Sequence, residues 1–204
     1  MLEAHDLAGH RGHARLFEGL SFTIDAGHAL VVTGANGTGK TTLLRLLAGL
    51  SLPAAGEVRW MGRATAPFDA ELRSVLAFAG HLPALKDELT AEENLASLVA
   101  LDDASVADDA LAAALGSVAL TRQRALPARV LSQGQRRRIG LARLTLLKRP
   151  LWILDEPATA LDGEGVELLT RILARHLADR GMIVAATHSP LGIAADRRRA
   201  LVLG

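Results

Sequence analysis

The sequence predicts an α/β fold with a mainly parallel sheet, and two patterns support this prediction. First, uniformly apolar runs of strand length recur along the chain, as in Ala29–Thr33, Leu151–Leu154 and Met182–Ala186. Such strands are typical of parallel sheets that are buried on both faces. Second, segments with helical spacing of apolar residues separate these runs, and alternation of strands with helices builds parallel sheets.

The elements follow in order from apolar periodicity and turn residues. The predicted strands are Leu20–Ile24, Ala29–Thr33, Glu57–Trp60, Ser74–Ala79, Leu151–Leu154, Met182–Ala186 and Ala200–Leu203. The predicted helices are about Lys40–Leu50, Ala91–Leu101, Ala107–Leu115, Gln133–Leu147 and Glu164–Leu177. Glu57–Trp60 alternates like an exposed antiparallel strand. The last helix has one apolar face that runs from Val166 to Leu177.

Length and composition favour one domain and exclude several classes of protein. The chain has 204 residues, which is enough to bury a sizeable core. Lys and Arg total 23 against 22 Asp and Glu, and aromatic residues make up only 3%. This balance and the scarcity of stacking rings argue against nucleic-acid binding. The absence of cysteine excludes disulfides and thiolate chemistry, and the absence of a signal peptide or apolar span predicts a cytoplasmic chain.

A glycine-rich loop follows the strand Ala29–Thr33. It reads Gly34-Ala35-Asn36-Gly37-Thr38-Gly39-Lys40-Thr41 and fits the pattern G-x-x-x-x-G-K-[ST]. Glycines let backbone N–H groups turn toward phosphate oxygens, and the following helix adds its positive N-terminal end. We expect Lys40 to reach the β- and γ-phosphates, and the Thr41 hydroxyl to ligate Mg²⁺. The alternative is an ordinary turn, which the position of one of only three lysines disfavours.

Two adjacent acids end the apolar strand Leu151–Leu154. Asp155 and Glu156 would be costly at the end of a buried strand unless their charge is used. In a phosphate-loop enzyme the first acid holds Mg²⁺ through its water shell, and the second can polarise the attacking water. The alternative is a solvated turn before Pro157, which the phosphate loop in the same chain disfavours.

A third motif precedes the arginine-rich helix, and we call Leu131-Ser132-Gln133-Gly134-Gln135 the signature motif. The five motifs, in order, are the loop Gly34–Thr42, the signature motif, the segment Leu151–Glu156, the turn Ala160-Leu161-Asp162 and His188. In this order and spacing the chain resembles the nucleotide-binding domain of ABC transporters over nearly its whole length. The resemblance implies one ABC ATPase domain over residues 1–204. It would have a RecA-like core with an antiparallel β subdomain at about 1–75 and 125–204, and a small helical subdomain at about 82–130.

The resemblance also implies a mechanism. Two copies would stack head to tail, with two ATP molecules between them and Leu161 and Asp162 at the seam. The nucleotide-binding residues would be Gly34, Ala35, Asn36, Gly37, Thr38, Gly39, Lys40, Thr41 and Thr42 of one copy, with Ser132, Gly134 and Gln135 of the other. The catalytic residues would be Lys40, Glu156 and His188, the last holding the attacking water. Taken singly, Ser132 is also an ordinary helix N-cap and His188 a polar residue at a strand end.

Three positions depart from the family pattern. Gln133 stands where the family usually has Gly, which we expect to be tolerated because Ser132 and Gly134 carry the contacts. The usual adenine-stacking aromatic falls near Arg11, whose flat guanidinium can stack on a base instead. His81 replaces the usual Gln, and its imidazole could hydrogen-bond toward Mg²⁺ or water and can titrate.

The segment Gly80–Leu95 indicates which subfamily of ABC transporter ATPases the chain resembles. It is similar to that of the haem-exporter ATP-binding subunits of cytochrome c maturation, which are also short and carry His in place of Gln. Part of this pattern, Thr90 with Glu93, is also the spacing of a helix capping box. ABC ATPases contact their membrane partners here, so we expect an integral-membrane permease to contact residues 81–95. The family implies ATP hydrolysis at the cytoplasmic face of the bacterial inner membrane, for haem export or release of a haem-loaded chaperone.

Direct haem binding is not expected. Met182 lies inside an apolar strand, and the remaining histidines, which are His5, His10, His13, His28 and His176, lack ligand spacing and are predicted to be solvated. Two other functions remain open. One is a soluble ABC ATPase that acts in assembly or on nucleic acid. Such proteins tend to carry long insertions, which do not fit in 204 residues. A small-molecule kinase shares the phosphate loop but would not explain the signature motif.

Overall fold

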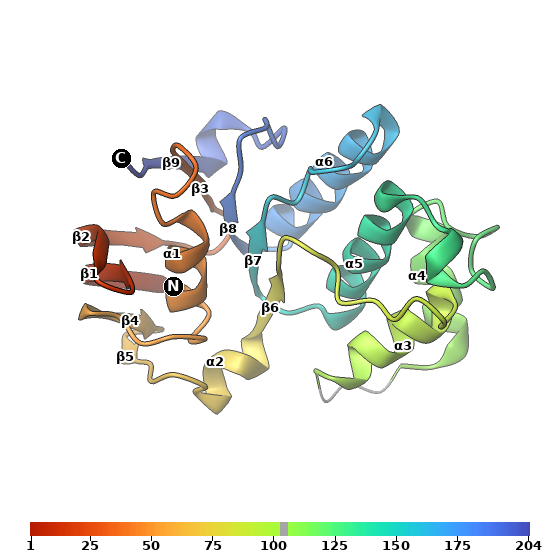
Figure 1. The fold of residues 1–204 in the computed structure, drawn as a ribbon, viewed down its shortest axis with the longest axis horizontal. Helices are drawn as coiled ribbons and strands as arrows, with labels where there is room; N and C mark the ends of the chain where they lie inside the picture. The colour runs from red at the N-terminus through yellow and green to blue at the C-terminus, as the bar shows by residue number, and fades with distance from the viewer. Residues whose placement is uncertain (103–105) are drawn as a thin grey trace.

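The computed structural model in Figure 1 describes residues 1–102 and 106–204. The strands are β1 (Leu2–Arg11), β2 (Ala14–Ile24), β3 (Ala29–Thr33), β4 (Ala55–Trp60), β5 (Arg63–Ala64), β6 (Leu76–Ala79), β7 (Leu151–Asp155), β8 (Met182–Ala186) and β9 (Arg198–Val202). The α-helices are α1 (Lys40–Leu47), α2 (Ala70–Val75), α3 (Ala91–Ala100), α4 (Asp108–Ser117), α5 (Gln133–Leu147) and α6 (Gly163–Ala178). Short 3₁₀ turns cover Ala128–Val130 and Ala195–Arg197. Residues 103–105, inside the predicted helical subdomain, lie outside the described residues.

The described strands form two sheets, which confirms the predicted fold class. One sheet has the order β6-β7-β8-β3-β9 and its neighbouring strands are parallel. The other has the order β2-β1-β4-β5 and is antiparallel. In the parallel sheet, β3 lies between β8 and β9, so strands far apart in sequence become neighbours. All five parallel strands end at one edge, where loops of α/β proteins bind ligands.

The parallel sheet separates two hydrophobic cores. On β3, Leu30 and Val32 face the core that contains α1 and the antiparallel sheet, whereas Ala29 and Val31 face the core that contains α3 to α6. This alternation follows from the two-residue period of a strand and explains why β3, β7 and β8 are apolar throughout. Figure 1 shows α1 between the two sheets, with α5 and α6 beyond the parallel sheet.

Three helices pack together at one end of the molecule. Helices α3 and α4 contact α5 and each other, and α5 contacts α6 and β6. Thr90 caps α3 and forms a reciprocal capping box with Glu93, as the sequence spacing predicts. Within residues 1–102 and 106–204, we find no helix long and apolar enough to cross a membrane.

Several predicted boundaries are wrong. The N-terminal strand β1 was not predicted, and β2 starts at Ala14 rather than Leu20. Ser74 and Val75 belong to helix α2 rather than to a strand, because the Asp69 side chain accepts a hydrogen bond from the Leu72 N–H and caps that helix. The strand β4 is antiparallel as predicted, but it buries Val58 and Trp60. The β1–β2 hairpin and the short helix α2 have weak apolar periodicity, which is why the sequence pattern does not predict them correctly.

The prediction that His176 is solvated is also wrong. Its ring stacks on Trp152 with centroids 3.7 Å apart and an interplanar angle of 8°. The Gly181 backbone lies so close that a Cβ there would be 2.2 Å from His176 Nε2. Burial lowers the pKa of the His176 imidazole. His10 and His13 are exposed as expected, whereas His5 and His28 are half-buried.

Candidate active site

A cavity of about 270 Å³ opens at the edge of the parallel sheet where β3, β7 and β8 end. The residues that line it are Arg11, Leu16, Asn36, Gly37, Gly39, Lys40, Thr41, Thr42, His81, Asp155, Glu156 and His188. Eleven of these are candidate site residues from the sequence, and Leu16 is the exception.

 Leu16 is therefore the lining residue that sequence reasoning missed, and its apolar side chain lies against Gly39.

The loop after β3 needs glycine at two places. Gly34 has φ +143, and a Cβ there would lie 2.2 Å from the Leu203 carbonyl oxygen. Gly39 has φ +102, and a Cβ there would lie 2.9 Å from the Leu16 side chain. Both glycines let the loop turn tightly between β3 and α1, whose first residues Lys40, Thr41 and Thr42 line the cavity. This is the cradle that phosphate binding requires.

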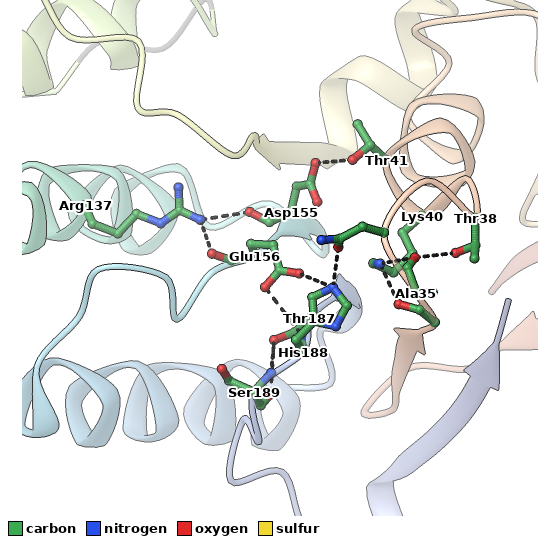
Figure 2. Close-up of polar contacts among 12 residues, drawn as sticks. Ala35, Thr38, Lys40, Thr41, Arg137, Asp155, Glu156, Thr187, His188 and Ser189 are labelled. Atoms are coloured by element: carbon green, nitrogen blue, oxygen red, sulfur yellow. Dashed lines mark hydrogen bonds and ion pairs between the residues drawn. The ribbon is translucent and has the colours of Figure 1, made fainter. Parts of the chain in front are cut away.

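Lys40 lies folded over this loop. Its Nζ donates to the carbonyl oxygens of Gly34 at 2.7 Å and Ala35 at 3.0 Å. The Thr38 hydroxyl donates to the same Ala35 carbonyl at 3.0 Å, as Figure 2 shows. Only 9% of Lys40 is exposed, so its charge is concentrated at the mouth of the cradle.

The two acids of β7 lie on the facing side of the cavity. Asp155 is buried, and its Oδ2 accepts a hydrogen bond from the Thr41 hydroxyl at 2.8 Å. Glu156 follows with φ +50, and its backbone N–H donates to the Ala186 carbonyl at 2.9 Å. This hydrogen bond extends the pairing of β7 with β8 by one residue beyond Asp155, so it holds the Glu156 backbone at the end of the strand. The predicted pair of acids therefore meets the phosphate loop across the cavity (Figure 2).

His188, which follows β8, contacts both the phosphate loop after β3 and the acid after β7. Its Nε2 lies 3.1 Å from Asn36 Oδ1 and 3.6 Å from Glu156 Oε1. Its backbone N–H donates to Glu156 Oε2 at 3.4 Å. Figure 2 shows the imidazole between the carboxylate and the phosphate loop. A ring in this place can orient a small molecule held between loop and acid.

Arg11 and His81 both line the cavity, as the sequence predicts for site residues. Arg11 ends β1 and is exposed, next to the hairpin that leads into β2. His81 is also exposed and follows β6 in the chain. The only aromatic rings in the described lining are the imidazoles of His81 and His188.

The signature motif lies elsewhere. Ser132 caps α5, where its hydroxyl accepts from the Gln135 N–H at 3.2 Å and Gln135 Oε1 accepts from the Ser132 N–H at 2.9 Å. A Cβ on Gly134 would lie 2.9 Å from the Ala160 carbonyl oxygen. Within the described part of the chain, none of these three residues lines the cavity. The motif is thus a capped helix start that lies outside the lining of this cavity.

An ion pair ties this helix to the turn before α6. Arg138 Nη2 lies 2.7 Å from Asp162 Oδ1, and Asp162 also caps α6 through the Gly165 N–H at 2.9 Å. The Gly165 N–H and the Arg138 guanidinium hold the pKa of the Asp162 carboxyl below its usual range. The signature motif and the turn Ala160-Leu161-Asp162 therefore form one surface.

Arg137 is a buried site neighbour that sequence reasoning missed. An arginine on a helix is expected to be solvated, but only 7% of Arg137 is exposed. It donates to the backbone carbonyls of both acids, including the Asp155 carbonyl at 2.8 Å. A signal was available, because Arg137 shares a helical stripe with Leu141 and Leu144, which are both buried.

The residues present fit a nucleotide with Mg²⁺. The described residues contain no group of three His, Cys, Asp or Glu side chains that could hold a metal ion alone. Mg²⁺ in phosphate-transfer sites usually has one or two protein ligands, with substrate phosphates and water completing its octahedron. Thr41 and Asp155, 2.8 Å apart beside the glycine cradle, match that requirement.

Together, the strand, glycine cradle, lysine and paired acids define a phosphate-loop nucleotide-binding domain, and the capped signature helix gives it the ABC type. The sequence pattern of the family described as ABC transporter matches residues 17–159. The "Cytochrome c biogenesis ATP-binding export protein CcmA" of Nitrosomonas europaea is 50% identical over 94% of this chain and 90% of its own length. The protein of the same name from Dechloromonas aromatica is 47% identical over the whole of both chains. The chain therefore belongs to the ABC transporter family and, within it, to the cytochrome c biogenesis ATP-binding export proteins.

Solved structures agree on the fold. A dimeric post-hydrolysis structure of the ATP-binding cassette MJ0796, bound to ADP and Pi, superposes with a TM-score of 0.85. That match covers 100% of this chain and 94% of the cassette, at 24% sequence identity. A putative ABC transporter ATP-binding protein from Pyrococcus furiosus gives a TM-score of 0.84, covering 98% of this chain and 96% of the other. At this identity the likeness establishes the fold.

Proposed function

We propose that this chain binds and hydrolyses ATP as the ATP-binding subunit of a cytochrome c maturation complex. Hydrolysis would drive haem export or release of a haem-loaded chaperone at the cytoplasmic face of the bacterial inner membrane. The observation that carries the proposal is that one cavity is lined by Lys40, Thr41, Asp155, Glu156 and His188 together. The names of the full-length relatives supply the cytochrome c part.

The phosphate groups would lie on the loop Gly34–Thr42. The Lys40 ammonium would leave the Gly34 and Ala35 carbonyls and bind phosphate oxygens, since both positions are within reach of a flexible four-carbon chain. Mg²⁺, held by Thr41 and through water by Asp155, would neutralise charge on the transferred phosphate. His81, on the same lining, would add a hydrogen bond to its water shell.

Glu156 would accept the proton of the attacking water. Its carboxylate lies at the end of β7 and faces the loop, with His188 Nε2 3.6 Å from Oε1. His188 would orient that water and contact the γ-phosphate, while Asn36 Oδ1, 3.1 Å away, holds the ring. Positioning and electrostatic stabilisation supply most of the rate enhancement in phosphoryl transfer.

The base would stack on Arg11. Arg11 lines the cavity at the end of β1, and a guanidinium offers a flat cationic face where a tyrosine ring is the usual choice. The chain contains no tyrosine, so the base-binding role falls to another kind of side chain.

A second copy would complete each site. Ser132, Gly134 and Gln135 lie at an exposed helix start away from the chain's own cavity, which suits contact with a γ-phosphate bound by another copy. Two copies stacked head to tail would bring each signature motif to the partner's loop. The ATP-binding cassette MJ0796, which has the same fold, was solved as a dimer.

The permease would dock in an apolar groove of about 350 Å³ beside the predicted contact segment 81–95. The lining includes Leu82 and Pro83 from that segment and Leu98 and Leu101 from the region of α3. Leu82 and Leu101 are each 76% exposed, which is unfavourable for large apolar side chains without a partner. A short amphipathic segment of an integral-membrane protein would cover them.

The function can be tested in a bacterium that lacks its own cytochrome c biogenesis ATP-binding export protein. Expression of this chain should restore c-type cytochromes, measured by staining for covalently bound haem, and Lys40→Ala should not. A matched control is Lys148→Gln, which changes an exposed lysine far from the cavity. If purified chain hydrolyses ATP but restores no cytochrome, it is another ABC ATPase, either of soluble assembly type or of a different transporter.

A further inference from the structure

The guanidinium of Arg137 contacts five backbone carbonyls. Nη1 donates to Gly80 at 3.0 Å and His81 at 2.7 Å, and Nη2 donates to Asp155 at 2.8 Å and Glu156 at 2.5 Å. Nε donates to Pro157 at 3.4 Å. An arginine has five N–H donors, so each donor has one acceptor here.

The five carbonyls belong to two separate segments. Residues 80–81 follow β6, and residues 155–157 contain both acids of the cavity. Strands β6 and β7 are paired as far as Ala79 and Leu154, so beyond that point the ladder no longer joins the two segments. Beyond that point Arg137 joins the two segments through hydrogen bonds, of which Figure 2 shows those to the Asp155 and Glu156 carbonyls.

A buried cation in this place has a cost that only a full set of acceptors offsets. Burial lowers the pKa of the Arg137 guanidinium, and the nearby charges of Asp155 and Glu156 oppose that shift. Leaving donors unpaired in such a site would be strongly destabilising. The two segments are therefore favoured in the single arrangement that satisfies all five donors.

The Glu156 backbone needs such support. Its φ of +50 is uncommon for a residue with a long side chain, and such a conformation persists only where neighbours fix it. Two contacts fix it here, because its N–H donates to Ala186 and its carbonyl accepts from Arg137. The direction of the Glu156 carboxylate follows from that backbone.

Arg137 also lines the apolar groove, together with Gly80 and Leu82. The same side chain thus borders the groove on one side and holds the backbone of the catalytic acid on the other. We propose that Arg137 is a positioning residue that makes residues 80–81 and 155–157 move as one unit, so that occupancy of the groove sets the position of Glu156. This inference rests on the proposed function for the roles of the groove and of Glu156.

Kinetics of the purified chain test the positioning role. In Arg137→Gln, we expect kcat for ATP hydrolysis to fall about tenfold or more with KM for ATP within about twofold, because the phosphate loop is untouched. Arg137→Lys should also lose rate, since one ammonium has three donors on a single nitrogen and cannot satisfy all five carbonyls of the two segments. The matched control is Arg149→Gln, which removes a half-buried guanidinium that bonds to the Asp102 carbonyl at 2.9 Å, away from both segments.

Hydrogen exchange tests the linkage directly. Peptides covering residues 78–82 and 154–158 should both exchange faster in Arg137→Lys and remain at the wild-type rate in Arg149→Gln. Faster exchange in one segment alone, or in neither, would overturn the inference. So would a kcat for both Arg137 variants within about twofold of wild type. If Arg137→Gln does not fold, Arg137→Lys decides both measurements.

These outcomes are separable from those of the proposed function. A wild-type chain that hydrolyses no ATP would refute the proposed function, and exchange of the two segments would still test the linkage. A wild-type chain that hydrolyses ATP, with Arg137 variants that behave like Arg149→Gln, would refute the linkage alone.

Discussion

The phosphate loop and the signature motif are both helix starts, yet they differ in almost every structural respect. The loop before α1 is closed by Lys40 and faces buried Asp155 across a cavity. The signature motif before α5 satisfies its own helix start through the capping box of Ser132 and Gln135. Helix α1 packs on one face of the parallel sheet and α5 on the other.

The difference supports the proposed arrangement, in which each copy supplies one half of two sites. The cavity holds the acids, the lysine and the histidine, which is the set that chemistry on a bound phosphate needs. The signature motif has a capped helix start with Ser132 exposed, and Ser132, Gly134 and Gln135 do not line that cavity. The two regions of one chain would become complementary only when two chains meet.

Mixing two inactive variants is the strongest test of this comparison. Lys40→Ala should reduce ATP hydrolysis to background by removing a phosphate-binding charge, and Ser132→Arg should do so by blocking the partner's phosphate. In a mixed dimer one site carries both changes and the other carries neither. With independent sites and random pairing, the mixture should recover about a quarter of wild-type activity.

The control for mixing is the double variant Lys40→Ala/Ser132→Arg. When it is combined with either single variant, each site of the mixed dimer carries at least one change, so activity should stay at background. Full activity of Ser132→Arg by itself would show that each chain acts alone, and would break the comparison between the two half-sites.

Glu156→Gln separates binding from chemistry on the cavity side. The amide is nearly isosteric but cannot accept the proton of water, so we expect hydrolysis to slow by about a hundredfold while ATP still binds. Because ATP then persists between two chains, size-exclusion chromatography with ATP and Mg²⁺ should show a dimer. A monomer that retains ATP under those conditions would contradict the head-to-tail arrangement.

A smaller effect is expected on the pH dependence of stability, through a buried histidine that packs against β7 on the cavity side. His176 stacks on Trp152 of β7, and burial lowers the pKa of its imidazole from the ordinary value of 6.5. The unfolded chain therefore binds the proton more readily, so stability is complete above that value and falls as pH decreases through the lowered pKa.

Melting temperatures measured between about pH 7 and pH 5 would show this dependence. Wild type should lose stability faster over that range than His176→Phe, which keeps a flat ring on Trp152 but cannot titrate. His10→Gln, which changes an exposed histidine of β1, should keep the wild-type slope. Equal slopes for all three proteins would remove His176 as the cause.

The parts predicted well from sequence are those with strong local patterns. Apolar runs gave β3, β7 and β8, helical spacing gave α3, α5 and α6, and the glycine-rich loop lies where the pattern predicts. Each is set by residues close together in the chain, so a window of sequence contains the information. The family resemblance then extended these patterns to the whole fold.

The parts that were missed depend on distant contacts. Strand β1 alternates small, polar and apolar residues and is defined by its pairing with both β2 and β4. Burial of Arg137 depends on carbonyls from residues 80–81 and 155–157, and burial of His176 depends on Trp152 and Gly181. From sequence alone, a charged or imidazole side chain is expected to be exposed to solvent. Only its tertiary contacts show that it is buried.

The position of β3 has a consequence for how the protein is made. This strand, which carries the phosphate loop, pairs only with β8 and β9 among the described strands. Those neighbours begin at Met182 and Arg198, so residues 29–41 are synthesised long before the strands that fix them. Such long-range pairing is slow to form. A growing chain therefore has its phosphate-binding sequence early, but both strands that pair with β3 are available only once residues up to Val202 have been synthesised.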